Sequence, residues 1–253
     1  MSFAVRKQAG LSFLVCEPLE RAGFKNAFST RLGEISFAKE TIDESLKVFL
    51  PVIDAIGWSV KTAQQTHSDI RVHVDDNPPL EGDALVTQRT QTLIGIKTAD
   101  CVPVLIGDPV SGVTAAVHAG WRGTLQRIAQ KTVSDICSRF SINPAHCIAA
   151  IGPSACGDCY DVGPEVVSQF QNEFHLWDAF MTLGNGGKAK LNSPEANRQQ
   201  LLKAGLLNAN IHVAAYCTMH QNDLFFSHRR GGGPGRLLSV IGKRAGSSAH
   251  GPN

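Results

Sequence analysis

The chain has 253 residues, of which 43% are hydrophobic and 18% are charged, so it can bury a core and lies near the upper limit of a single domain. The formal net charge of +2 and the scattered basic residues argue against a nucleic-acid partner and favour small molecules. No apolar run reaches the roughly 18 to 20 residues that span a bilayer, and the N-terminus lacks a signal-peptide core. We therefore expect no membrane partner and a cytoplasmic location. The seven cysteines form an odd set in a large chain, which favours reduced thiols over a disulfide framework.

Short apolar runs bounded by glycine, proline or polar residues predict the strands. In chain order they are Leu11–Cys16, Lys25–Ser29, Ile70–Val74, a strand within 81–87, Leu93–Lys97, Gly112–Val117, Ile148–Ile151, Ile211–Tyr216 and Leu237–Ile241. Residues 1–244 are expected to form one domain without an internal repeat or a linker. The remaining residues, 245–253, are expected to form a disordered tail.

Helices are expected where apolar residues recur three or four positions apart. The four segments run from Thr41 to Gly57, from Thr124 to Phe140, from Pro164 to Phe174 and from Ser193 to Gly205. Thr41 and Glu44 form a possible capping box at the start of the first helix. Pro51 should kink or divide that helix.

Three potential metal ligands lie at the boundaries of predicted strands. Cys101 and His118 each follow a strand, and His67 precedes another. A His/Cys/His set of this kind holds zinc while leaving a fourth position open, which is typical of a catalytic site. The same Cys101 and His118 could instead be a nucleophile and its base without any metal. Asp83 and Asp100 can orient an imidazole or accept a hydrogen bond from a substrate, or can be ordinary turn or cap residues.

Several arginines near glycine turns are candidates for binding an anion. Gly120–Gly123 precedes a predicted helix, so its free N–H groups, with Arg122 beside them, can receive a phosphate. An ordinary glycine turn explains the same residues equally well. Arg31 follows a strand and is either a solvated loop residue or an anion-binding fork. Arg229-Arg230 and the glycines after them favour a flexible hairpin turn over a phosphate loop, although these arginines could still reach an anion.

A second possible metal site starts from Cys156-x-x-Cys159. This spacing is half of a zinc or redox site. A structural zinc would need a second pair of ligands, which is absent nearby unless His146 or Cys147 contributes. The sequence therefore disfavours a structural metal at this position.

The motifs resemble those of the YfiH/laccase-domain family over nearly the whole chain. The matching motifs, in the family's order, are QTHS at 65–68, DALVT at 83–87, TADCVPVL at 98–105, HAGWRGT at 118–124, IGPS with CYDVGPEV at 151–166, ANRQQLL at 196–202 and FSHRRGGGPGR at 226–236. The resemblance implies an α+β fold of mixed β-sheets flanked by helices, shared distantly with toxins that are cysteine hydrolases. The chain departs from the family in residues 34–40, where a longer loop is usual.

The resemblance also implies an activity and a set of site residues. Members of the family have been called polyphenol oxidases, purine nucleoside phosphorylases with adenosine deaminase activity, and peptidoglycan editing factors. For this chain it implies a monomer or homodimer that uses zinc to split adenosine, inosine, guanosine or methylthioadenosine with phosphate, and that deaminates adenosine. The residues expected to be catalytic and to bind the metal are His67, Cys101 and His118. Those expected at the substrate site are Arg31, Gln65, Asp83, Asp100 and Arg122, of which Arg31 orients the substrate and Gln65, Asp83 and Asp100 support the metal ligands.

Two other activities stay open as alternatives. One is a copper-dependent polyphenol oxidase, with copper in place of zinc. A multicopper oxidase needs many histidines around several copper ions, and only three candidate ligands cluster in this sequence, so this is the weaker alternative. The other is a Cys–His hydrolase that acts on amides, as in peptidoglycan editing.

Overall fold

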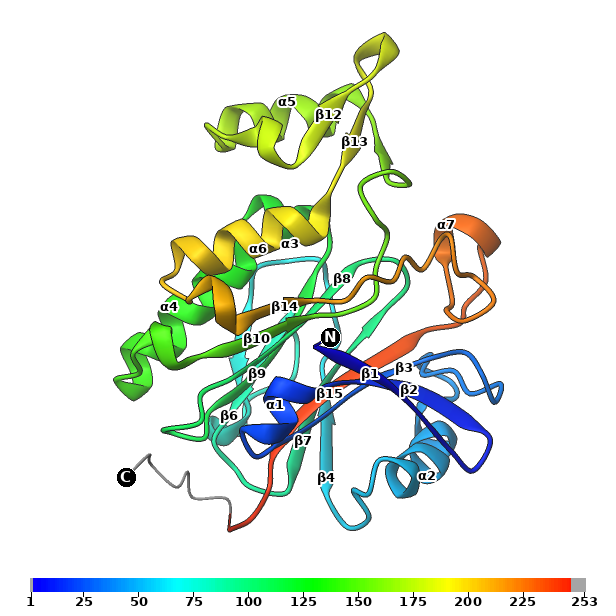
Figure 1. The fold of residues 1–253 in the computed structure, drawn as a ribbon, viewed down its shortest axis with the longest axis vertical. Helices are drawn as coiled ribbons and strands as arrows, with labels where there is room; N and C mark the ends of the chain where they lie inside the picture. Colours follow the sequence, from blue (N-terminus) through cyan, green and yellow to red (C-terminus); the bar gives the residue numbers. More distant parts are fainter. Residues whose placement is uncertain (1, 247–253) are drawn as a thin grey trace.

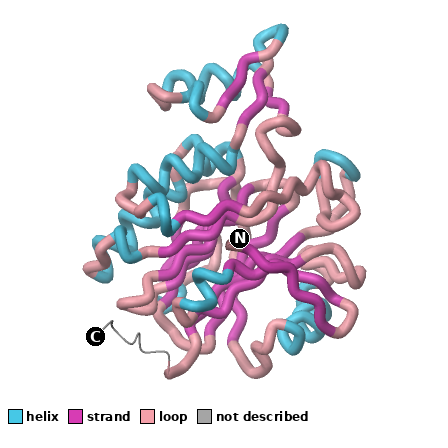
Figure 2. The backbone as a smooth tube through the Cα atoms, viewed as in Figure 1, coloured by secondary structure: helices cyan, strands magenta, loops and turns pink. Residues whose placement is uncertain are grey.

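The architecture is a pair of β-sheets that lie face to face, with helices on their outer faces (Figures 1 and 2). It is known from a computed structural model, which describes residues 2–246. The expected α+β fold with mixed sheets and flanking helices is confirmed. All of the expected C-terminal tail except its first two residues lies outside the described residues. Within the described part of the chain, no helix is long and apolar enough to cross a membrane.

The first sheet is built from both ends of the chain. Its six strands, in spatial order, are β1 (Phe3–Gln8), β2 (Leu11–Cys16), β3 (Phe24–Ser29), β15 (Leu237–Lys243), β7 (Thr92–Thr98) and β4 (Ser59–Thr62). All neighbours are antiparallel except β4 and β7, which are parallel. Helix α1 (Glu17–Arg21) joins β2 to β3, and α2 (Ile42–Val52) covers the outer face through Phe49 and Val52.

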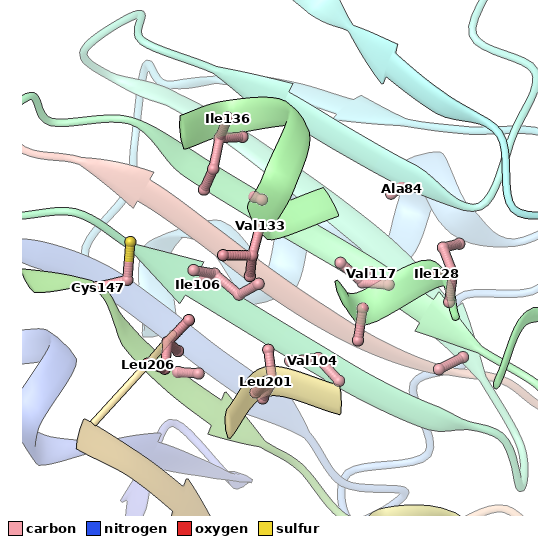
Figure 3. Packing of buried hydrophobic residues seen from close by; sticks show 14 of the residues in the cluster. Ala84, Val104, Ile106, Val117, Ile128, Val133, Ile136, Cys147, Leu201 and Leu206 are labelled. Carbon is pink, nitrogen blue, oxygen red and sulfur yellow. The ribbon is translucent and has the colours of Figure 1, made fainter. Parts of the chain in front are cut away.

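The second sheet comes from the middle of the chain. Its six strands, in spatial order, are β14 (Ile211–Val213), β10 (Ile148–Ile151), β8 (Val102–Gly107), β9 (Thr114–Ala119), β6 (Ala84–Thr87) and β5 (Arg71–His73). Helices α4 (Ile128–Phe140) and α6 (Ser193–Lys203) cover its outer face. Figure 3 shows Val133 of α4 and Leu201 of α6 beside Val104 and Ile106 of β8.

The main core fills the space between the two sheets. Phe28 and Ile94 of the first sheet pack with Leu85 and Leu105 of the second, and each of these side chains is almost wholly buried. Burying a side chain of this size stabilises the fold by about 1.5 to 3 kcal/mol. The two sheets are therefore held together through one shared core.

A smaller group of elements projects from this sandwich, at the top of Figure 1. It contains β11 (Asp161–Val162), α5 (Pro164–Glu173), β12 (Met181–Leu183) and β13 (Ala189–Leu191), with β13 in the middle of a three-stranded sheet. Phe170 lies at the centre of its own hydrophobic cluster. The remaining helices are α3 (Trp121–Leu125), α7 (His228–Gly231) and the short 3-10 turns Val74–Asp76, Pro144–His146, Trp177–Ala179, Asn185–Gly187 and Asn208–Asn210.

Several predicted elements differ from the observed ones. The expected helix 124–140 is two helices, α3 and α4, because Arg127 has a φ of 62° and breaks the hydrogen-bond ladder. The helix after Thr41 ends at Val52, and Pro51 lies in its last turn instead of dividing it. The capping box does not form, since the Thr41 hydroxyl donates to the carbonyl of Ser36.

Candidate active site

The pairing of β8 with β9 brings Cys101 and His118 together. Cys101 lies in the link through which the chain passes from β7 in the first sheet to β8 in the second. In the antiparallel register, Val102 is opposite Ala119 and Pro103 is opposite His118. The residue before β8 therefore lies beside the end of β9, and it is the unpredicted strand β8, not β7, that pairs with β9. His118 is inside β9 and not beyond it, and its side chain is buried.

Asp83 fixes the positions of both histidines. Because β6 pairs with β9 so that Ala84 is opposite Val117, Asp83 lies next to His118. Its carboxylate accepts a hydrogen bond from the His118 Nδ1 at 2.7 Å and from the His67 N–H at 3.1 Å. The N–H groups of the residues on either side of His67 also donate to it. One fully buried carboxylate thus orients one imidazole and holds the loop that carries the other.

The three predicted ligands converge. One ligand atom each from His67, Cys101 and His118 lies within 4.8 Å of the other two. The two imidazole rings are nearly perpendicular, with centroids 4.9 Å apart. Because the Nδ1 of His118 is bonded to Asp83, its Nε2 is left for the cluster, which is the usual arrangement around a metal-bound histidine.

Gly120 leaves the space that an ion at this cluster requires. A Cβ atom at this position would lie 3.1 Å from Cδ2 of His67 and 3.3 Å from the Cys101 sulfur. Glycine therefore keeps open a hollow that any side chain would fill. The donor set of one thiolate and two imidazoles suits zinc or copper. Among the described residues, no fourth histidine, cysteine or carboxylate joins this group.

The same contacts change the ionisation of the cluster. Burial alone would raise the pKa of the Cys101 thiol, but hydrogen bonds and charge from His118 and His67 outweigh burial and lower this pKa to about 6. Burial opposes the charged form of His118, yet Asp83 and Cys101 raise its pKa to about 9. The pKa of Asp83 is lowered in spite of its burial by hydrogen bonds from His118 and Ser68. Without a metal, Cys101 and His118 therefore form a thiolate–imidazolium pair near neutral pH.

The cluster opens into a cavity of about 950 Å³, a volume typical of small-molecule sites. His67, Cys101 and His118 all line it. Its other lining residues include two aromatic side chains and five cationic ones, namely Trp121, Tyr160, Lys39, Lys97, Arg122, Arg229 and Arg236. This combination can receive an aromatic group together with an anion.

The predicted substrate residues fall into two groups. Gln65, Asp100 and Arg122 line the cavity. Asp83 is fully buried and bonded to the protein, so it acts on the histidines and does not reach a substrate. Among residues 2–246, the cavity lining does not include Arg31, whose guanidinium donates to the carbonyl of Asn222. Asp83 thus supports the metal ligands, and a substrate role for Arg31 stays a prediction.

Arg229 lies in the cavity where the sequence predicts a flexible turn. Residues His228–Gly231 form helix α7 instead of a hairpin turn. The backbone N–H of Arg229 donates to the Asp100 carboxylate at 2.9 Å, and its guanidinium lies 4.9 Å from the centre of the Tyr160 ring. The hydrogen bond to Asp100 thus holds Arg229 next to the loop that carries Cys101. The sequence analysis allows Arg229 to bind an anion, and its place in the cavity lining is compatible with that role.

A second cluster contains Cys156 and Cys159. Their partners are Cys217 and His220 and not the nearby His146 or Cys147, so the expectation of an absent second pair is wrong. The four ligand atoms lie within 4.8 Å of one another. Cys217 and His220 have the same spacing as Cys156 and Cys159. This repeated spacing is the signal in the sequence that indicates a second pair of ligands.

The fold and the cluster together define an α+β protein with a Cys–His–His cluster that could hold a metal, beside a cation-lined cavity. The family model described as multi-copper polyphenol oxidoreductase laccase matches residues 38–244, and the chain belongs to this family. The expected YfiH/laccase-domain membership is thereby confirmed. The chain is similar to the crystal structure of the hypothetical protein YfiH of Bacillus licheniformis, with a TM-score of 0.85, 29% identity, and coverage of 95% of this chain and 99% of that one.

Two curated relatives carry the names of enzymes. The chain is 44% identical over 165 residues to adenosine deaminase RL5 from an unknown prokaryotic organism, a match that covers 64% of this chain and 63% of that protein. It is 35% identical over 243 residues to a purine nucleoside phosphorylase of Deinococcus radiodurans, covering 89% of this chain and 92% of the relative. These names support an enzyme of this family.

Proposed function

We propose that this chain is a zinc-dependent purine nucleoside phosphorylase that also deaminates adenosine at the same site. The observation that carries the proposal is the open side of the His67/Cys101/His118 cluster, which faces a cavity lined by arginines. The names of the similar proteins from Deinococcus radiodurans and the unknown prokaryote support it. A zinc ion bound by the three side chains would supply Lewis acidity at this position.

The cavity residues have separate tasks in phosphorolysis. The cationic side chains at Arg122, Arg229 and Arg236 can bind phosphate, which attacks C1′ of the ribose while the bond from C1′ to N9 of the base breaks. The base leaves with the bonding electrons and takes up a proton. Trp121 and Tyr160 offer aromatic surface to the base. In deamination, a water oxygen bonds to C6 of adenosine and ammonia leaves.

The test is incubation of the purified protein with adenosine and phosphate, followed by chromatography and elemental analysis. Adenine and ribose phosphate are expected from phosphorolysis, and inosine is expected from deamination. Cys101→Ala should lose both the ion at the His67/Cys101/His118 cluster and the turnover. Retention of full adenosine or inosine turnover by this variant would reject the proposal. Oxidation of a phenol by the copper-loaded protein, without nucleoside turnover, would favour the polyphenol oxidase instead.

One observation favours a second candidate. Cys101 lies beside His118, which lowers the pKa of the Cys101 thiol, and Asp83 holds the far nitrogen of His118. This is the arrangement of a cysteine hydrolase, in which the thiolate attacks an amide carbonyl and the imidazole protonates the leaving amine. Such an enzyme would keep its activity after chelation of metal and lose it on treatment with a thiol reagent. The phosphorylase would lose its activity on chelation.

A further inference from the structure

The second cluster joins two loops that are far apart in the sequence. Cys156 and Cys159 lie between β10 and β11, whereas Cys217 and His220 lie between β14 and α7. The sulfurs of Cys159 and Cys217 are 3.7 Å apart although 58 residues separate them in the chain. We propose that these four side chains bind a structural zinc ion, distinct from the ion at Cys101.

The distances within the cluster match a tetrahedral zinc site. With zinc–sulfur bonds of about 2.3 Å and zinc–nitrogen bonds of about 2.0 Å, tetrahedral angles place two sulfurs about 3.8 Å apart and a sulfur and a nitrogen about 3.5 Å apart. The observed separation of the Cys159 and Cys217 sulfurs is 3.7 Å. The His220 Nδ1 lies 3.7 Å from the Cys156 sulfur and 3.5 Å from the Cys159 sulfur. The Nε2 of His220 is only 3.1 Å from the Cys159 sulfur, so Nδ1 is the nitrogen that fits.

The chemistry of the donors selects the metal and its role. Three thiols and one imidazole are a soft donor set that favours zinc over magnesium or calcium. All seven cysteines are free, and 3.7 Å is far beyond the length of an S–S bond. The backbone N–H of Cys156 points at the Cys217 sulfur at 3.4 Å, a contact that stabilises a metal-bound thiolate. Four protein donors close a tetrahedral shell, which is typical of a structural ion and not of a catalytic one.

The position of the cluster indicates that the ion would hold two loops together beside Asp100. Ser154 forms a β-bridge with Cys217, so the two loops already run side by side. Thr218, next to Cys217, donates its hydroxyl to the Asp100 carboxylate at 2.6 Å. The N–H of Ala155, next to Cys156, donates to the Asp100 carbonyl at 3.0 Å. An ion at the cluster therefore fixes both loops around the residue that precedes Cys101.

The proposal is tested by measuring metal content in single-site variants. The wild-type protein should contain about two zinc ions per chain, and Cys159→Ser and Cys101→Ala about one each. Cys137→Ser is the matched control because Cys137 belongs to neither cluster, and it should keep about two. In Cys101→Ala, the remaining ion must have the three-sulfur site, so cobalt substitution should give strong thiolate-to-metal charge-transfer absorption. Chelation should also lower the Tm of this variant.

Three results would overturn the proposal of a structural zinc ion. If Cys159→Ser folds and keeps two ions, the cluster is not a metal site. If Cys159→Ser does not fold, the Cys101→Ala protein decides: absence of any bound ion would reject the proposal. A third result would assign a redox function to the cluster instead. In protein purified without reductant, mass spectrometry would then find a disulfide between two of the three cysteines and no metal at this cluster.

Discussion

The Nδ1 of His118 and the Oδ1 of Asp83 lie 2.7 Å apart in the buried interior of the second sheet, and this contact links the metal cluster to the fold. The carboxylate also receives the backbone N–H groups of residues 66–68. A carboxylate with so many donors is a buried charge that is fully paired. Its removal should therefore disturb both stability and metal binding.

We expect Asp83→Asn to lower the free energy of unfolding by about 3 kcal/mol, because an amide offers one acceptor oxygen and leaves buried donors without a partner. Zinc affinity should fall about 10- to 100-fold, since His118 loses the group that orients it. Denaturant unfolding and metal titration measure the two effects. Asp69→Asn is the control in the same loop: it removes a partly exposed ion pair with Lys131 and should change stability by less than about 1 kcal/mol. Equal effects of the two substitutions would contradict the role given to Asp83.

The thiolate–imidazolium pair predicts how the stability of the metal-free protein depends on pH. Cys101 has a lowered pKa of about 6, so its contribution is present at higher pH and is lost as the pH falls through about 6. His118 has a raised pKa of about 9, so its contribution is present at lower pH and is lost as the pH rises through about 9. The difference in Tm between wild type and Cys101→Ala should shrink on both sides of this interval. A difference in Tm between the two proteins that stays constant from pH 5 to 10 would contradict the thiolate–imidazolium pair.

The same pair predicts the reactivity of one thiol. In metal-free protein, alkylation of Cys101 should accelerate as the pH rises through about 6, well below the ordinary cysteine value of about 8.5. Asp83→Asn should move this midpoint upward, because His118 loses the carboxylate that favours its charged form. Peptide mass spectrometry separates Cys101 from Cys16 and Cys147, whose pKa values burial raises to about 11 and about 12. A midpoint for Cys101 near that of a free thiol would exclude the ion pair.

The parts of the fold that follow from local pattern could be predicted from the sequence. Leu11–Cys16 and Ile148–Ile151 are strands with the predicted limits. Strand β8 was not predicted because all its residues are buried, some against the helices and some between the sheets, so no polar–apolar alternation marks it. Pro103 inside it also argues against a central strand.

The site could be predicted as far as its residue types, but not its contacts. His67, Cys101 and His118 cluster as the family resemblance implies, although His118 lies inside β9 and not after it. Arg31 is outside the cavity lining and donates to the carbonyl of Asn222, almost two hundred residues away in the chain. No periodicity or spacing reports a contact of that kind, which only the packing of the two sheets creates.

Gly120 gives a prediction that separates the space for the metal from the ligands themselves. Gly120→Ala should fold normally, since a φ of −67° is open to alanine, but its Cβ would lie 3.3 Å from the Cys101 sulfur. We expect at least about a tenfold loss of zinc affinity, with nucleoside turnover lost in parallel. Gly163→Ala is the matched control, because Gly163 also directly precedes a helix and has a similar conformation, with φ −80° and ψ 170°. A Cβ atom at Gly163 would meet no atom within 4 Å. Equal zinc content in both variants would contradict the proposed position of the ion.

The last prediction compares two arginines that make similar contacts but lie in different places. The guanidinium of Arg229 lies 4.9 Å from the Tyr160 ring in the cavity, and that of Arg31 lies 5.1 Å from the Phe226 ring outside the cavity lining. Arg229→Gln should raise the KM for phosphate about 10- to 100-fold, because the anion loses a charge-assisted hydrogen bond of about 1.5 to 3 kcal/mol.

Arg31→Gln removes the same kind of aromatic contact, so it controls for loss of packing and of one positive charge. Its KM for phosphate should stay within about twofold of wild type, because weak surface charge effects are screened at physiological salt. Initial rates at varied phosphate and saturating adenosine measure both values. If Arg31→Gln raises the KM and Arg229→Gln does not, the anion binds beside Arg31 and the phosphate site proposed at Arg229 is wrong.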